Sequence, residues 1–239
     1  ISNSNTKVVL EGQGADEQQA GYLDYIINYL CYVPLRKLFS EYKKIKNVQG
    51  SHIYLKIGFF FSLICKVNGK KLAIKVIRML TGKDMTQYMV HLNHKLKLDS
   101  NKGLVNLIHY GDSRSMMYSI EARMPFMDYR LVEFTAKIPS IYKIHDGWTK
   151  YFARLAFNGK LPDEITWRKD KMGWPVPDKY WFEGELNNWL VSSVNDSKFI
   201  QEEIKKVRLD IDLSKIRLKK VIRLLNISVW HKVFFKNNK

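Results

Sequence analysis

Two glycines and two acidic residues near the start of the chain have the types and spacing of a phosphate site. Gly12 and Gly14 bracket a single residue, and Asp16 and Glu17 follow them. Glycines let backbone N–H groups approach an anion closely, because no Cβ intervenes. A carboxylate repels phosphate, so the acidic pair predicts a divalent cation as well. Mg²⁺ is usually held by one or two carboxylates together with phosphate oxygens.

The neighbouring residues predict a strand before this turn and a helix after it. Residues 8–10 are apolar strand formers, and a helical pattern begins near Gln18 and continues to about Glu41. The start of that helix would add backbone donors for an anion. Pro34 is expected to end one helix and to begin the next. The alternative is an ordinary strand–turn–helix connection, because short glycine motifs often match by chance.

Length and composition are typical of a globular protein. The 239 residues suffice for one sizeable domain or two small ones, and 46% are hydrophobic. The chain begins at Ile1, and we expect it to be a piece of a longer chain. Residues 1–7 contain no apolar leader, and the longest apolar run, 59–65, predicts a buried helix that is too short to cross a membrane. These features predict a cytoplasmic protein that has no membrane partner.

The net charge of +17 suggests anionic partners, including nucleic acid. A basic nucleic-acid-binding module would bind with a steep salt dependence. The lysines are spread along the whole chain, however, and aromatic residues are not grouped with them, so we expect no nucleic-acid partner. Cys31 and Cys65 fit reduced thiols, with one disulfide as the alternative. His91 and His94 have no further ligand nearby, so we expect no zinc site.

The second half of the chain predicts several capped helices. An apolar stripe at 104–108 has helical spacing. Asp128 is predicted to cap the next helix, which Pro139 ends. Thr149 is predicted to cap a further helix, and residues 162–177 to form a loop with a basic cluster.

The rest of the chain also predicts helices. Residues 42–98 suit several helices without clear limits, although 72–80 fits a helix or a strand. The stripes at 186–190 and 218–229 predict amphipathic helices that pack on the core; a membrane or partner surface is the alternative for the second. The predicted total is one buried strand, at residues 8–10, and at least eight helices. One strand cannot form a sheet, so we expect upstream sequence to supply its partner.

Several stretches, in the same order, together resemble the asparagine synthase domain of glutamine-hydrolysing asparagine synthetases. The turn at 10–17 with Ala20-Gly21-Tyr22 is similar to the family's pyrophosphate loop. The other similar stretches are 115–128, 147–154, 161–165, 168–174 and 225–230. The resemblance covers roughly residues 7–35 and 103–235. It implies an α/β fold of the adenine nucleotide alpha-hydrolase type, an ATP pyrophosphatase. Residues 1–239 would be its C-terminal portion, mostly α-helical with one core strand near residues 7–11.

The resemblance implies an activity for the full-length protein. Members of the family use ATP and Mg²⁺ to adenylate aspartate, and ammonia derived from glutamine then forms the amide. This is a carbon–nitrogen ligase of asparagine biosynthesis with glutamine as amido donor. The ammonia comes from a glutaminase domain, which would lie upstream in the full chain. Whether the protein forms a homodimer is left open.

The resemblance also implies roles for individual residues. Glu11, Gly12 and Gly14 fall where the family binds ATP and pyrophosphate. Asp16 resembles the carboxylate that holds Mg²⁺ and pyrophosphate. Lys150, as a catalytic residue, would neutralise charge on the phosphates. Gln13 occupies the catalytic position, often Glu, that is tied to forming the aspartyl-adenylate. Of the remaining motif residues, Glu121, Arg123 and Asp128 are expected to be structural, and Arg154 to assist Lys150 or to form an ion pair.

Departures from the family pattern concern the substrate more than the fold. Glu11 replaces the usual Ser, Gln13 cannot transfer a proton, and Ser113-Arg114 interrupts an Asp-Arg pattern. An amidotransferase acting on another carboxylate, in a glycan or natural-product pathway, is therefore an alternative. The family's Ser-Gly-Gly-x-Asp-Ser nucleotide loop and its N-terminal Cys are absent from these residues. We therefore expect this fragment to be inactive in ATP–pyrophosphate exchange, and a degenerate non-catalytic fragment is the last alternative.

Overall fold

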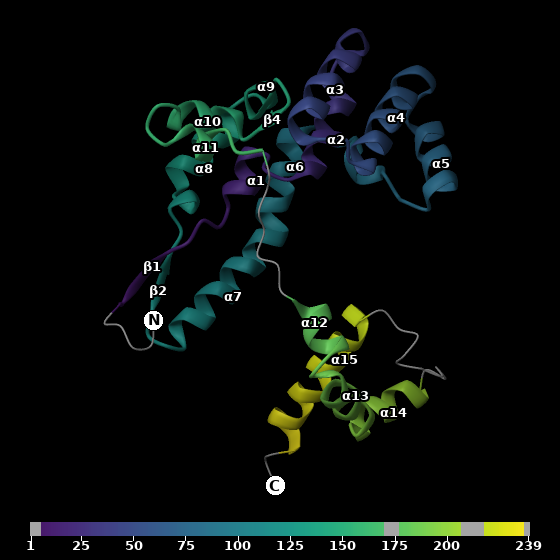
Figure 1. Ribbon diagram of the computed structural model, residues 1–239, viewed down its shortest axis with the longest axis vertical. Helices are drawn as coiled ribbons and strands as arrows, with labels where there is room; N and C mark the ends of the chain where they lie inside the picture. Colours follow the sequence, from purple (N-terminus) through teal and green to yellow (C-terminus); the bar gives the residue numbers. More distant parts are fainter. Residues whose placement is uncertain (1–5, 170–176, 207–217, 237–239) are drawn as a thin grey trace. The chain divides into compact units, whose positions relative to one another are not determined.

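The computed structural model describes residues 6–169, 177–206 and 218–236, and it contains two compact units, residues 1–171 and 172–239 (Figure 1). The described residues are mainly helical, as the sequence predicts. None of the described helices is both long and apolar enough to cross a membrane.

The first strand, β1 (Val8–Leu10), pairs in parallel with β2 (Glu121–Arg123). Val8 lies opposite Glu121 and Leu10 opposite Arg123. The prediction of a single strand is therefore wrong, because a partner comes from far downstream in this same chain. The strand is also not buried, since Leu10 is 73% exposed. Hydrophobic periodicity did not predict β2, because the first and last residues of this strand, Glu121 and Arg123, are charged.

The helical body of the first unit is built around α2 (Leu23–Tyr32), whose residues 25–30 are all buried. Helices α3 (Leu35–Gln49), α4 (Ile53–Asn68) and α5 (Lys70–Thr81) follow it, so residues 72–80 are helical. Pro34 separates α2 from α3, as predicted. The predicted helix start at Gln18 is wrong, because α1 (Ala15–Gln19) begins earlier and ends at Ala20, which has a left-handed φ of 58°.

A long helical segment connects this body with the strands. A short 3-10 helix, η1 (Thr86–Met89), leads into α6 (Leu92–Asp99), and a π-helical stretch, η2 (Ser100–Leu104), joins α6 to α7 (Val105–Met116). Figure 1 shows α7 running from α6 toward β2. The predicted stripe at 104–108 lies on this segment, yet of its apolar residues only Leu104 is buried.

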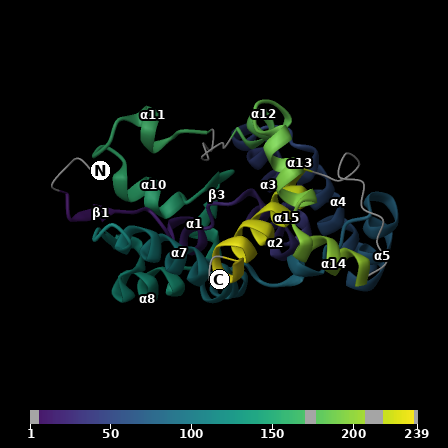
Figure 2. The ribbon, with the colours of Figure 1, turned by 90° about the horizontal axis from the view of Figure 1, so that it is seen from below.

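The C-terminal part of the first unit contains short elements. They are η3 (Pro125–Met127), α8 (Tyr129–Lys137), α9 (Ser140–Lys143), β3 (Ile144–His145), β4 (Trp148–Thr149), α10 (Tyr151–Phe157) and α11 (Asp163–Thr166). Of these, η3, α8 and α10 contact α1. Strands β3 and β4 form an antiparallel hairpin. Figures 1 and 2 show α1 close to both α8 and α10, which it contacts.

Asp128 caps α8, as predicted, because its carboxylate accepts a hydrogen bond from the Arg130 backbone N–H at 2.9 Å. The Arg130 side chain also contacts this carboxylate and lowers its pKa to about 2. We expect Asp128→Ala to lower the midpoint of thermal unfolding by about 2–4 °C at neutral pH. A carboxylate with a lowered folded pKa stabilises above its unfolded pKa and loses that effect as pH falls. The difference in melting temperature between the two proteins should therefore shrink from pH 5 to pH 2; a constant difference would contradict this account.

The second unit is a small helical cluster. It contains α12 (Asp178–Glu183), α13 (Asn187–Asn195), α14 (Lys198–Lys206), α15 (Leu218–His231) and the π-helical η5 (Lys232–Lys236). Leu190 and Val194 of α13 pack against Val221 and Leu225 of α15. The stripe at 218–229 thus faces a core, as expected. The predicted loop at 162–177 is partly wrong because it contains α11, and its residues 170–176 lie outside the described residues.

Candidate functional site

The two glycines of the first turn have different surroundings. A Cβ on Gly12 would meet no atom within 4 Å, so the space beside this residue is open. Gly14 has a φ of 90°, and a Cβ there would lie 2.4 Å from the Met127 sulfur. Gly14 is therefore required for internal packing at the start of α1. Because α1 has only five residues, its dipole contributes less than the predicted long helix would.

Gln18 fixes α1 to the neighbouring segments, a role that the sequence analysis missed. Its side chain is 5% exposed. The amide nitrogen donates to the backbone carbonyl of Phe126, and the amide oxygen accepts from the Thr135 hydroxyl at 3.2 Å. Helix α1 is thus tied to both η3 and α8. A helical pattern identifies Gln18 as polar, but these partners lie too far along the chain to be inferred from it.

Asp16 and Lys150, which are far apart in the sequence, form an ion pair. Lys150 Nζ lies 2.7 Å from Asp16 Oδ1, and the side chains of lysine and aspartate are 32% and 24% exposed. Lys150 has a left-handed φ of 53° and immediately precedes α10. Left-handed backbone is unfavourable for a residue with a Cβ and tends to occur at functional sites. The structure therefore brings together two of the residues selected from the sequence.

Gly21 provides the space in which this pair meets. A Cβ on Gly21 would lie 1.8 Å from Asp16 Oδ1 and 2.4 Å from Lys150 Cε. No side chain fits in this gap without moving one of the two partners. Gly21 belongs to the Ala20-Gly21-Tyr22 motif, but its role does not follow from the sequence, because Asp16 and Lys150 lie far apart in the chain.

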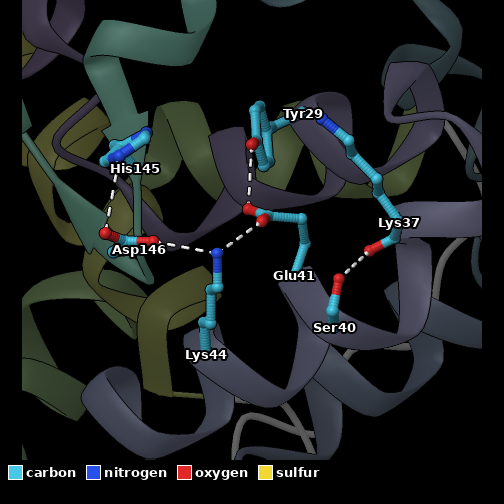
Figure 3. A network of polar contacts seen from close by, with 7 residues as sticks. All are labelled: Tyr29, Lys37, Ser40, Glu41, Lys44, His145 and Asp146. Carbon is cyan, nitrogen blue, oxygen red and sulfur yellow. Dashed lines mark hydrogen bonds and ion pairs between the residues drawn. The ribbon is translucent and has the colours of Figure 1, made fainter.

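The hairpin that carries Lys150 is anchored to α3 by a polar network (Figure 3). Lys44 contacts Asp146 at 2.9 Å and Glu41 at 3.1 Å, and Tyr29 donates to Glu41 at 3.0 Å. The Lys44 ammonium lowers the pKa of Asp146. A Cβ on Gly147 would lie 2.4 Å from the Lys44 carbonyl oxygen, so the turn packs directly on the α3 backbone. The position of Lys150 thus depends on contacts made by α3.

Near Lys150 the predicted cap is wrong, and of the two roles expected for Arg154 the ion pair is not found among the described residues. Thr149 does not cap α10, because it belongs to β4 and Lys150 is the residue that precedes the helix. Arg154 forms no ion pair with any described residue. Its guanidinium donates to the backbone carbonyls of Thr149 and Thr166 and lies 4.8 Å from the centre of the Trp148 ring. Burial lowers its pKa. Arg154 therefore holds the hairpin and α11 together.

Other predicted site residues are not joined to this pair. The Gln13 side chain is exposed and has no hydrogen bond to Asp16 or Lys150. The Glu11 backbone N–H donates to the backbone carbonyl of Arg123 at 2.8 Å. The Glu11 carboxylate lies near Gly111 of α7. The Glu121 carboxylate forms an ion pair with the Arg123 guanidinium at 2.8 Å, which agrees with the structural role expected for both residues.

Lys143, at the end of α9, is a buried lysine that sequence analysis did not identify. The residue is 1% exposed, and its ammonium group makes no hydrogen bond or ion pair with the described residues. Burial lowers its pKa to about 8, from 10.5. An amine whose folded pKa is lowered destabilises the fold fully below that pKa, and the penalty disappears as pH rises toward the unfolded pKa.

We expect Lys143→Met to stabilise the protein by on the order of 2–3 kcal/mol at pH 7. The substitution removes the buried charge, and the methionine side chain fills the space of the lysine's aliphatic stem. Denaturant unfolding of the full-length protein would measure this effect. The advantage of the variant should decrease between pH 8 and pH 10.5. Lys137→Met, at an exposed position of α8, is the matched control and should change stability little. Equal effects of the two substitutions at all pH values would contradict the assignment.

Comparisons with known proteins add to this geometry. A family model described as Asparagine synthase matches residues 1–232. "Asparagine synthetase [glutamine-hydrolyzing] 1" of Bacillus subtilis is 37% identical over 87 residues, which are 36% of this chain and 14% of that protein. "Putative asparagine synthetase [glutamine-hydrolyzing]" of Mycobacterium tuberculosis is 29% identical over 227 residues, or 82% of this chain and 34% of that protein.

The chain thus spans about a third, or less, of the length of these curated relatives. No solved structure matches it significantly.

Proposed function

Because the chain belongs to the asparagine synthase family, we propose that the full-length protein is a glutamine-dependent asparagine synthetase that adenylates aspartate with ATP. The observation that carries this proposal is the ion pair of Asp16 and Lys150. It places a carboxylate that suits a metal–pyrophosphate complex beside an ammonium that suits a phosphate. Both residues stand at the positions that the family resemblance selects.

We propose that residues 1–239 are the C-terminal portion of an ATP pyrophosphatase domain with an adenine nucleotide alpha-hydrolase-like α/β fold. The parallel pairing of β1 with β2 supports an α/β class, since parallel strands are typical of sheets covered by helices. The relatives' greater length leaves room for an upstream nucleotide loop and a glutaminase domain. The proposed ammonia source is that glutaminase domain.

The proposed reaction has two steps. A carboxylate oxygen of aspartate attacks the α-phosphorus of ATP, and pyrophosphate leaves as the bond to the β-phosphate oxygen breaks. Ammonia then attacks the acyl carbon of the adenylate, and AMP leaves with loss of a proton from nitrogen. Negative charge develops on the phosphate oxygens in the first step. Lys150 is positioned to stabilise that charge, and the open backbone at Gly12 allows close approach of the nucleotide.

The donor set fits Mg²⁺ bound together with phosphate. Asp16 supplies one carboxylate, and Mg²⁺ characteristically takes one or two carboxylates plus phosphate oxygens and water. When bound there, the ion would neutralise charge on the leaving pyrophosphate. Lys150 Nζ contacts Asp16 Oδ1 at 2.7 Å. We propose that Lys150 turns from this oxygen to the phosphates when nucleotide binds, so that the ion pair keeps both groups in place beforehand.

A second candidate function is an amidotransferase with another carboxylate substrate. The observation that favours it is Glu11, a carboxylate where the family usually has a small hydroxyl, which lies next to α7. A negative charge there would repel an acidic substrate if it faced the substrate's own carboxylate. Gln13 could position such a substrate but cannot exchange a proton with it.

Exchange of labelled pyrophosphate into ATP by the full-length protein tests both candidates. The proposed synthetase predicts exchange that requires aspartate and Mg²⁺. A panel of other acids, including glutamate, a sugar acid and a short peptide, tests the second candidate. Exchange with one of these acids but not with aspartate would support the amidotransferase. Exchange with none of them would overturn the adenylation proposal.

A further inference from the structure

A cavity of about 420 Å³ lies beside α1, on the side of Glu17. Its volume lies within the range of small-molecule sites, which is roughly 300–1,000 Å³. Three helical segments line it: α1 with the start of α2, the end of α6, and the π-helical η2 with the start of α7. π-helical stretches within long helices often occur at functional sites. The cavity is separate from the contact between Asp16 and Lys150.

The cavity contains a buried carboxylate without a counter-ion. Glu17 is 7% exposed and lines the cavity. Its only hydrogen bond among the described residues comes from the Tyr22 hydroxyl, at 2.8 Å, and it has no ion-pair partner there. Buried charges are normally paired, because an uncompensated charge in a region of low dielectric is costly. A cation in the cavity would supply the missing counter-ion.

The other charged groups of the lining reinforce this preference. Asp24 and Asp99 also line the cavity, and Lys95 is its single ammonium group. Lys95 is already bound to Asp99, at 2.6 Å. The Tyr25 hydroxyl donates to the same carboxylate at 2.9 Å. With three carboxylates and one ammonium, the lining has an excess of negative charge in a chain whose net charge is +17.

The uncharged part of the lining suits an organic body. The rings of Tyr22 and Tyr25 lie 5.5 Å apart, centre to centre, and both tyrosines line the cavity together with Leu104 and Leu107. Burial and the nearby carboxylates raise the pKa of both tyrosines, so their hydroxyls remain hydrogen-bond donors and their rings stay neutral. Aromatic faces attract organic ammonium groups. A strongly hydrated metal ion would gain less from such a surface.

We propose that this cavity binds a small organic amine in its ammonium form, with Glu17 as the counter-ion and the tyrosine and leucine side chains around the organic body. Aspartate does not fit this description, because its net negative charge would meet the three carboxylates. The proposed ligand therefore differs in charge from the acidic substrate of the proposed synthetase. Its test does not depend on catalytic activity.

Calorimetric titration of the full-length protein with three ligands of the same shape tests the proposal: benzylamine, benzyl alcohol and benzoate. Benzylamine should bind at least about ten-fold tighter than the neutral alcohol, as expected for a charge-assisted hydrogen bond in a partly buried site. Benzoate should bind most weakly. Equal affinities for the amine and the alcohol would overturn the proposed chemistry.

Two variants locate the binding. Glu17→Gln keeps an oxygen that can accept from Tyr22 and should weaken benzylamine binding about ten-fold while leaving the alcohol unaffected. Glu133→Gln removes an exposed carboxylate of α8 outside the cavity and is the matched control. If Glu17→Gln does not fold, Leu107→Trp, at a half-exposed lining position, should fill the space and weaken both ligands. Benzylamine binding that survives Leu107→Trp, or that Glu133→Gln weakens as much as Glu17→Gln does, would overturn the site.

Discussion

Replacement of Lys150 by methionine is expected to lower the rate of ATP–pyrophosphate exchange by the full-length protein about 10²–10³-fold. Removing one preorganised group that stabilises transition-state charge typically has an effect of this size. Asp16→Asn should cause a loss of similar size, together with a requirement for more Mg²⁺. Because the two side chains contact each other at 2.7 Å, their effects should not be independent. The double variant should lose less activity than the product of the two single losses.

Lys160→Met is the matched control for Lys150. Lys160 is an exposed lysine shortly after α10, so its replacement removes the same charge from the same part of the chain. Its exchange rate should stay within about two-fold of the original, since exposed charges act weakly at a distance in salt. A comparable loss in Lys150→Met and Lys160→Met would mean that general charge, and not the site, is responsible. Full exchange activity in Lys150→Met would remove this lysine from the proposed mechanism.

Gly21→Ala, which adds one methyl group, is expected to lower both the exchange rate and the stability of the protein. The added Cβ would lie 1.8 Å from Asp16 Oδ1, so the carboxylate must leave its position or the backbone must shift. Overpacking of this kind typically costs about 1–3 kcal/mol of stability. The exchange rate should fall about 10²-fold even at temperatures at which the variant is fully folded. Far-ultraviolet circular dichroism and thermal unfolding would establish that temperature range.

A double-mutant cycle separates the local effect of Gly21→Ala from a general loss of stability. The coupling between Asp16 and Lys150, measured by denaturant unfolding, should be about 0.5–1 kcal/mol with glycine at position 21 and near zero with alanine. Gly103→Ala is the control, since a Cβ on Gly103 would meet no atom within 4 Å. It should leave the coupling unchanged. Undiminished coupling in Gly21→Ala would contradict the proposed role of Gly21, whatever the outcome of the exchange assay.

The sequence determined the local features of this protein. The strand and turn at 8–14, the break at Pro34 and the Asp128 cap each depend on residues that are neighbours in the chain. The apolar stripe of α15 likewise predicted that Val221 and Leu225 face a core, although Val229 of the same stripe is exposed. Local capping and periodicity follow from backbone geometry over one or two turns, so they can be inferred without the tertiary fold. The long motifs identified the family for the same reason, because they are contiguous.

Only the tertiary structure decided which distant residues meet. The polar strand β2 becomes the partner of β1, Lys150 reaches Asp16, and Gly21 accommodates both side chains. The sequence expectation of a Thr149 cap failed because pairing of β4 with β3 overrode the local preference. Glu17 likewise lines a cavity only through the placement of α6 and η2. Contacts between residues far apart in the chain depend on how all intervening helices pack, and neither spacing nor periodicity encodes that packing.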